Sequence, residues 1–149
     1  MKTNKEDMIM AQGQIVRSQA NEFLEALFHS TDSKGNPTYY YIGLSTTAPD
    51  VNGGNVTEPD SATGYARKQL SMMGAAVDGQ IQNNEIIFMG ESLGDGWGTI
   101  AYFFISKTQS STPIFHAPLN AAVQVPAGYV PIFRTGALIV GLDKDTLDI

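Results

Sequence analysis

With 149 residues, 42% of them hydrophobic and 16% charged, the chain has the length of one domain and enough apolar material for one core. The formal net charge of -6 excludes the basic surface with which proteins neutralise nucleic-acid phosphates. The chain has no cysteine, which excludes a disulfide framework and a thiolate metal site.

Residues 1–13 are predicted to form a flexible N-terminal arm, followed by a single β-rich domain over residues 14–149. The arm mixes lysines with acidic residues and has no long apolar run, so it does not match a secretory signal. No later stretch approaches the roughly 20 apolar residues of a membrane span. We therefore expect a soluble chain that is synthesised in the cytoplasm and does not associate with a membrane.

Residues 14–29 predict the one helix of the chain, because apolar residues recur there at spacings of three and four. The apolar stripe consists of Val16, Ala20, Phe23 and Leu27, with Leu24 and Phe28 beside it. Gly35 and Pro37 lie in the turn-forming stretch that ends the helix. We expect Phe23, Leu24 and Leu27 to cover one end or face of a sheet.

The rest of the chain predicts short strands separated by glycine and proline turns, which is typical of a sandwich or barrel. In the first strand, residues 38–45, the side chains of Tyr40, Ile42 and Leu44 share one face, opposite Tyr39, Tyr41 and Gly43. The further strands are expected at residues 65–70, 80–89, 99–106, 114–117, 122–125, 130–133 and 137–140, with Pro118 between two of them.

The predicted fold class is mainly β: an antiparallel β-sandwich or jelly-roll-like domain with one N-terminal α-helix. Strand 99–106 is apolar enough to be buried on both faces, so we expect it at the centre of the sheet. One core is expected to contain residues from several strands and turns. These are Phe103, Ile105, Ile87, Leu138 and Trp97.

The long polar loop at residues 47–63 is the expected contact surface, because long loops in compact domains often carry function. Asp50, Glu58 and Asp60 could in principle flank a glycosidic bond or hold calcium through oxygen ligands. Their spacing does not match a calcium-binding loop, and a solvated loop is the favoured interpretation.

Other candidate chemistry is weak, and the sequence predicts no catalytic, cofactor-binding or metal-binding residue. Residues 90–94 match the letters of a serine-hydrolase elbow around Ser92, but a turn and a strand follow instead of a helix. His29 and His116 have no partner at ligand spacing. Arg67 and Arg134 lie in strand-like contexts, where an arginine is expected to pair with a buried carboxylate or carbonyl.

Several short segments occur along the chain in a distinctive order. Gly-Tyr-Ala-Arg at 64–67 is followed by Trp-Gly-Thr-Ile at 97–100 and Pro-Ala-Gly at 126–128. Further segments of the same kind are residues 41–45, 48–49, 84–88, 113–119 and 133–140. Together these segments, which cover about residues 39–140, resemble bacteriophage virion structural proteins of the tail-fibre or minor tail protein type.

The resemblance implies a structural component of a bacteriophage particle: tail fibre, baseplate, collar or capsid decoration. Such a protein is not an enzyme and acts by assembly with other virion proteins and with copies of itself, as a homo-oligomer. Its expected location is the virion, after synthesis in the host bacterial cytoplasm. The alternative function is a glycan-binding, lectin-like module that recognises a host-surface glycan through loop 47–63 and exposed tyrosines. An enzyme that cuts cell-wall polysaccharide through the three carboxylates is the least favoured hypothesis.

Overall fold

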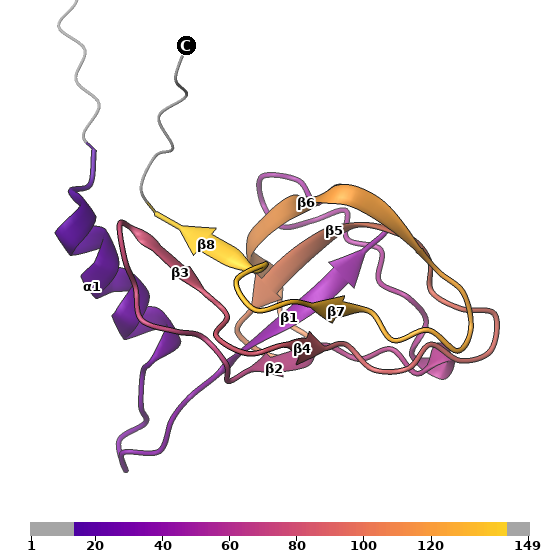
Figure 1. Cartoon of the computed structure of the whole chain (residues 1–149), viewed down its shortest axis with the longest axis horizontal. Helices are drawn as coiled ribbons and strands as arrows, with labels where there is room; N and C mark the ends of the chain where they lie inside the picture. Colours follow the sequence, from indigo (N-terminus) through magenta and orange to yellow (C-terminus); the bar gives the residue numbers. More distant parts are fainter. Residues whose placement is uncertain (1–13, 143–149) are drawn as a thin grey trace, which may run out of the picture.

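The computed structural model describes residues 14–142 as one helix, a short 3-10 helix and eight strands (Figure 1). The elements are α1 (Arg17–Phe28), β1 (Tyr40–Ser45), η2 (Ser61–Thr63), β2 (Lys68–Leu70), β3 (Gln80–Gln82), β4 (Ile87–Phe88), β5 (Gly98–Ser106), β6 (Pro113–Val125), β7 (Ile132–Phe133) and β8 (Ile139–Gly141). The predicted arm at residues 1–13 lies outside the described residues. No helix in the described part of the chain is long and apolar enough to cross a membrane.

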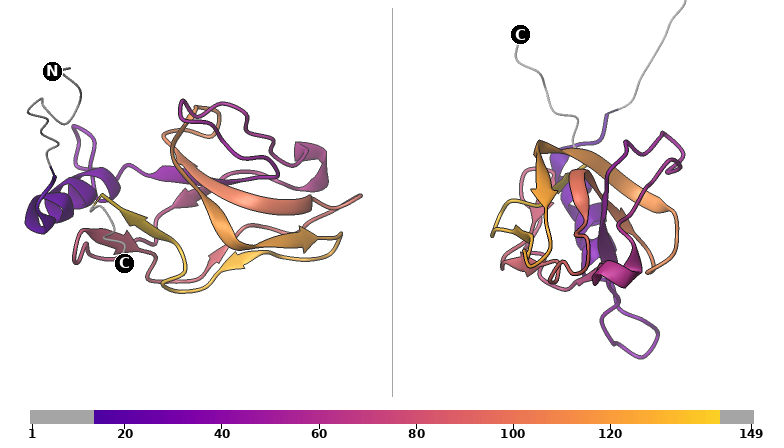
Figure 2. Two further views of the ribbon diagram at one scale, coloured as in Figure 1. Left: turned by 90° about the horizontal axis from the view of Figure 1, so that it is seen from above. Right: turned by 90° about the vertical axis from the view of Figure 1, so that its right-hand side faces the viewer.

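The strands form an antiparallel sandwich, which confirms the predicted fold class. Four strands make the larger sheet in the order β2-β1-β5-β6, and two ribbons, β3 with β8 and β4 with β7, make the second layer. One core cluster contains side chains from both layers, among them Ile42 and Ile105 of the sheet and Ile81 and Leu138 of the ribbon side. Figure 2 shows the ribbons facing the sheet.

The predicted alternation along β1 is confirmed by its pairing with β5. Ile42 lies opposite Ile105, and Leu44 lies opposite Phe103, on the face that joins the core. Gly43 lies opposite Phe104, on the other face of the sheet. Because successive side chains point to opposite faces, this register determines which alternate side chains of β5 face the core.

Helix α1 covers one end of the sandwich and contacts β3 (Figure 1). Its buried residues are Ala20, Leu24 and Phe28, one from each successive turn. The prediction for Phe23 is wrong, since that side chain is 53% exposed. Residues spaced by four form a narrow stripe, and a helix that packs at the end of a sandwich buries only that stripe.

Several strand boundaries differ from the prediction. Strand β6 is continuous from Pro113 to Val125, so the break expected at Pro118 is wrong. Pro118 is tolerated because β6 is an edge strand, and a register shift between Ile100 and Tyr102 of β5 accommodates the irregular pairing. The strand predicted at residues 80–89 is divided into β3 and β4, and that predicted at 65–70 is shortened to β2.

Four of the five predicted core residues are buried together: Ile105, Ile87, Leu138 and Trp97. Phe103 is only half-buried and packs against the edge of this core, with its ring near that of Phe133. Phe104 is instead the fully buried neighbour. The prediction therefore placed too much burial on the first of two adjacent phenylalanines.

A hairpin between α1 and β1 projects from the body of the molecule (Figure 1). Thr31 and Pro37 form an isolated antiparallel bridge at its base, and residues 31–38 are all exposed. The Asp32 carboxylate accepts hydrogen bonds from the backbone amides of Lys34 and Asn36, at 2.8 and 2.9 Å. These bonds, that from Asn36 foremost, lower the pKa of Asp32. The hairpin thus holds its shape through its own turn.

Candidate assembly surface

The outer face of the larger sheet is organised around the Arg67 guanidinium. Its Nε and Nη2 atoms each donate to one oxygen of the Glu58 carboxylate at 3.0 Å, a bidentate ion pair. Nη1 donates to the Ser106 hydroxyl at 2.9 Å and to the carbonyl oxygens of Thr108 and Ser111. The Arg67 side chain is 8% exposed. The prediction that Arg67 pairs with a carboxylate or carbonyl is confirmed, and it pairs with both.

Tyr65 extends this network into the sheet. Its hydroxyl donates to Glu58 Oε1 at 2.6 Å and accepts from the backbone amide of Leu44 at 2.9 Å. Burial, and then the hydrogen bond to Glu58, raise the pKa of the Tyr65 hydroxyl far above its ordinary value. The ring also packs edge-on against Trp97, whose indole nitrogen donates to the Thr63 carbonyl. The Gly-Tyr-Ala-Arg and Trp-Gly segments are therefore one packed unit.

Gly43 makes room for this unit. The Arg67 guanidinium carbon lies 4.7 Å from the centroid of the Phe104 ring, which is close enough for a cation–π contact. A Cβ at Gly43 would lie 2.2 Å from Cζ of the same ring. Phe104 is thus enclosed between the backbone of β1 and the guanidinium, and only glycine fits at position 43.

Loop 47–63 lies beside this network, and its three carboxylates serve different local roles. Asp50 accepts from the amides of Asn52 and Gly54, both at 2.8 Å, and so shapes a turn. Glu58 binds Tyr65 and Arg67, as described above, and Asp60 accepts from the amide of Ala62 at the start of η2. Within residues 14–142, no three histidine, aspartate or glutamate side chains are grouped as metal ligands would be. The loop as a contact surface stays a prediction.

The serine and histidine candidates lie apart from one another. Ser92 is fully buried, its hydroxyl has no hydrogen-bond partner among the described residues, and the segment that follows it turns into β5. His29 contacts the Gly74 carbonyl at 2.8 Å, beside α1, whereas His116 lies exposed in β6. The elbow-like sequence therefore does not form the strand–turn–helix of a serine hydrolase.

The second layer is joined by the buried side chain of Asn83, which sits at the break between β3 and β4. Its amide nitrogen donates to the carbonyls of Glu85 and Arg134 at 2.8 and 2.9 Å. Its amide oxygen accepts from the backbone of Leu138 at 3.0 Å. Both polar atoms of the Asn83 side chain are thus hydrogen-bonded, as buried polar groups usually are, and their partners come from both ribbon segments.

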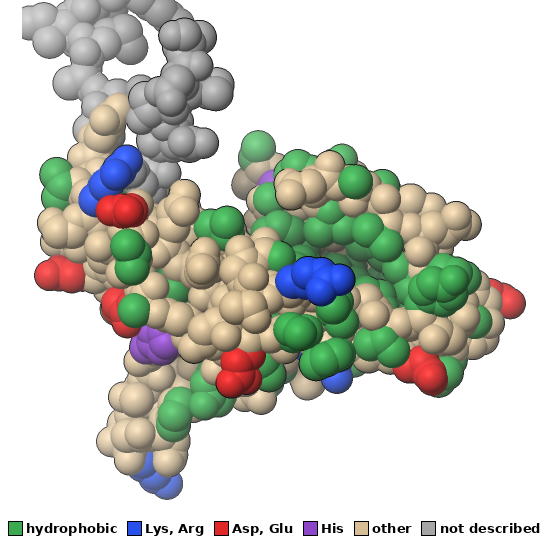
Figure 3. All heavy atoms as spheres, in the orientation of Figure 1, with side chains coloured by type: hydrophobic (Ala, Val, Ile, Leu, Met, Phe, Trp, Pro, Cys, Tyr) green, Lys and Arg blue, Asp and Glu red, His purple; other side chains and the backbone are tan. Residues whose placement is uncertain are grey.

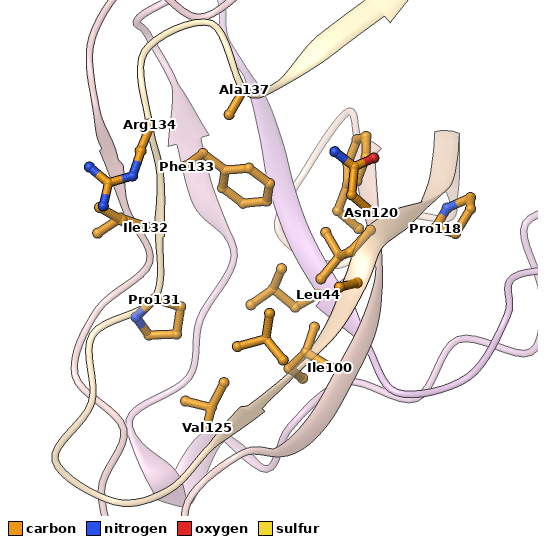
Figure 4. A pocket seen from close by; sticks show the side chains of 14 residues that line it. Leu44, Ile100, Pro118, Asn120, Val125, Pro131, Ile132, Phe133, Arg134 and Ala137 are labelled. Atoms are coloured by element: carbon orange, nitrogen blue, oxygen red, sulfur yellow. The ribbon is translucent and has the colours of Figure 1, made fainter.

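An apolar groove of about 390 Å³ lies between β6 and β7. Leu44, Ile100 and Phe103 lie on its sheet side, and the β6 segment from Pro118 to Val125 and residues 131–134 form its two walls. Figure 3 shows hydrophobic side chains gathered in this hollow, and Figure 4 shows Phe133 and Val125 at its sides. A volume of this size is in the range of small ligand sites.

The two walls of the groove are strand edges. Within residues 14–142, β6 pairs only with β5, and β7 pairs only with β4, so each has a side without a strand partner. Arg134 lies at the rim beside β7 (Figure 4). Its side chain is exposed and makes no hydrogen bond or ion pair with the described residues. The prediction of a buried partner for Arg134 is therefore wrong.

A family of phage proteins matches nearly the whole described chain. The family is described as "Podophage GP4 fiber I protein gp80", and its profile matches residues 14–141. The chain belongs to this family. It is therefore a phage fibre protein, as the resemblance in the sequence implied, and a component of the virion. Comparison with curated proteins finds no match.

The groove of this fibre protein was not predicted from its sequence. Its walls come from segments that the prediction placed as separate short strands, and their facing edges depend on the tertiary arrangement. One signal was available: the stretch from Pro113 to Val125 contains no charged residue. A strand of that length without charge is unusual at a sheet edge.

Proposed function

We propose that this fibre protein acts as a non-catalytic structural subunit, which binds other virion proteins and copies of itself. The observation that carries the proposal is the unpaired edge of β6 beside an open apolar groove. Soluble monomers usually protect such edges with charged residues or cover them. Here the thirteen residues of β6 include no charge, so a partner is the simplest source of cover.

Exposed apolar side chains near the groove support the same function. Val123 and Ile132 line the groove and are exposed, and Tyr129 and Val130, in the segment that leads into β7, are exposed as well. Contiguous apolar surface marks interaction sites in proteins that are otherwise soluble. The groove side is therefore the proposed face for assembly.

The polar groups that could perform chemistry have structural roles instead. Glu58 neutralises Arg67, Asp50 and Asp60 shape turns, and Ser92 is enclosed. A nucleophile needs a base in hydrogen-bond reach and an open path for substrate. None of these side chains combines the two features, which supports function by assembly.

The direct test is to measure this protein in purified phage particles by quantitative mass spectrometry, together with the mass of the isolated protein by light scattering. We expect a fixed copy number per particle and an oligomer in solution. The isolated protein should give no saturable binding on a panel of host cell-wall glycans. Saturable glycan binding by a monomer that is absent from purified particles would instead support the lectin-like alternative.

A further inference from the structure

The groove between β6 and β7 has the features of a site that lacks a strand. On β6, Val123 lies opposite the buried Ile100 and shares its face of the sheet, yet it is 47% exposed. Val125, on the same face two residues later, is 2% exposed. Ala121, in the irregular stretch of β6 before Val123, also lines the groove and is exposed. Residues at core-facing positions are therefore left uncovered along the middle of the groove.

The walls indicate the chemistry of the occupant. The outer edge of β6 presents backbone N–H and C=O groups that no described strand pairs. A hydrocarbon chain would fill the apolar floor but make no hydrogen bond to these groups. An extended polypeptide satisfies both, because its backbone adds to the edge while alternate side chains enter the groove.

We propose that Met8, Ile9 and Met10 of a neighbouring copy of this chain occupy the groove as an added strand along β6. This inference rests on the proposed assembly function and names the site and the segment that carry it. Outside the described residues, 1–13 and 143–149, this is the one stretch with three large apolar residues in succession. Met8 and Met10 share one side of a strand and enter the groove, and Ile9 faces away.

Length and charge agree with this occupant. Thirteen extended residues span up to about 43 Å, which exceeds the eight-residue wall of β6 at about 27 Å. Glu6 and Asp7 directly precede the apolar stretch, and Arg134 stands exposed at the rim. An acidic side chain placed there gives the guanidinium a partner of opposite charge.

The position of α1 favours a neighbouring copy over the same one. Residues 1–13 precede α1, which lies at one end of the long axis, whereas β6 and β7 lie toward the other end (Figure 1). An arm that leaves one copy at its helical end meets the groove of the next copy. This contact joins two different surfaces, and such heterologous contacts build rings or filaments.

Disulfide cross-linking tests the proposal without background, because the chain has no cysteine. Each experiment mixes two full-length single-cysteine variants. One variant carries Met8→Cys, Ile9→Cys or Met10→Cys in the arm, and the other carries Val123→Cys in the groove. The mixture is oxidised mildly and separated without reductant. We expect a mixed dimer from Met8→Cys or Met10→Cys about ten-fold above that from Ile9→Cys, since disulfides need Cα atoms within about 4.4–6.8 Å. Glu22→Cys, at an exposed position of α1, is the control for non-specific reaction and should match Ile9→Cys.

Three results would overturn the proposal. Equal cross-linking of all four variants would show random collision, and a dimer formed only by two Val123→Cys chains would show that β6 pairs with itself. An internal disulfide in the Met10→Cys, Val123→Cys double variant, with no mixed dimer from the single variants, would place the arm in its own groove.

A second measurement uses charge instead of a disulfide. Val123→Asp should lower the oligomer mass by at least two-fold in light scattering, whereas Thr99→Asp, at an exposed position of β5, should not. An unchanged mass for Val123→Asp would contradict the proposed site. If the wild-type protein is oligomeric and present in particles but the cysteine variants give no arm-to-groove cross-link, this inference is wrong and the proposed assembly function is still supported.

Discussion

Replacement of Arg67 by methionine should destabilise the fold more than any other exchange of a basic residue in the described region. Methionine keeps the aliphatic stem but removes the guanidinium, which leaves the Glu58 carboxylate without its counter-ion. Ser106, Thr108 and Ser111 lose a donor at the same time. Because Arg67 is also stacked on Phe104, a single substitution disturbs ion pair, hydrogen bonds and ring contact together.

The expected loss in the free energy of unfolding is about 3 kcal/mol. Breaking a buried ion pair by removing one partner costs about 3 to 5 kcal/mol. We expect the lower end of this range, because the Glu58 side chain is 28% exposed and water can solvate it in part. Arg134→Met removes the same charge from an exposed side chain, and its effect should stay within about 0.5 kcal/mol.

Urea unfolding followed by tryptophan fluorescence measures both variants, since Trp97 is buried beside Tyr65. A double-mutant cycle with Glu58→Gln then isolates the pair, and its coupling energy should be about 1 to 2 kcal/mol. A loss below about 1 kcal/mol for Arg67→Met, or equal losses for the two methionine variants, would show that the network contributes little to stability.

Substitutions at four further positions test the packing of this network and of the core edge beside it. Phe104→Ala should lower the free energy of unfolding by about 3 to 5 kcal/mol, and Phe103→Ala should lower it clearly less. Equal losses of unfolding free energy would contradict the burial assigned to the two rings. Gly43→Ala should lower the free energy of unfolding by about 1 to 3 kcal/mol, because the added Cβ meets the Phe104 ring. In the same unfolding assay, the Gly43→Ala, Phe104→Leu double variant should regain part of the free energy of unfolding that Gly43→Ala loses. Burial and the bond to Glu58 raise the pKa of Tyr65, so the contribution of this tyrosine to the free energy of unfolding is complete below about pH 10 and falls as the pH rises further. In urea titrations from about pH 8 to 11, the free energy of unfolding should fall more steeply for wild type than for Tyr65→Phe. Parallel curves for the two proteins would refute this assignment.

Features that depend on one strand and its neighbour could be predicted from the sequence. The uncharged, aromatic run in β5 indicated a central strand, and alternation placed Ile42 and Leu44 of β1 on one face. Arg67 was expected to find a carboxylate or carbonyl, and it finds Glu58 only nine residues away. Local pattern and common pairing chemistry were sufficient in each case.

Features that depend on what lies across the core could not be predicted. Phe103 and Phe104 are adjacent and identical. Phe103 faces the open groove on the core side of the sheet and stays half-buried, whereas Phe104, on the other face, is enclosed by Gly43 and the Arg67 guanidinium. The exposed positions of Ala121 and Val123 follow from an incomplete second layer, and the lack of charged residues between Pro113 and Val125 is the one sign of it in their own segment. Pro118 suggested a break because a sequence does not say which edge of a strand is unpaired.

The hairpin between α1 and β1 gives this fibre protein a natural site for labels. Its residues are all exposed, its turn is held by Asp32 and by bonds within the hairpin, and it stands away from the groove (Figure 1). Exposed loop tips with few outside contacts tolerate inserted sequence best. An epitope or fluorophore placed between Lys34 and Gly35 can therefore report where the subunit sits in a particle while both β6 and the Arg67 network stay intact.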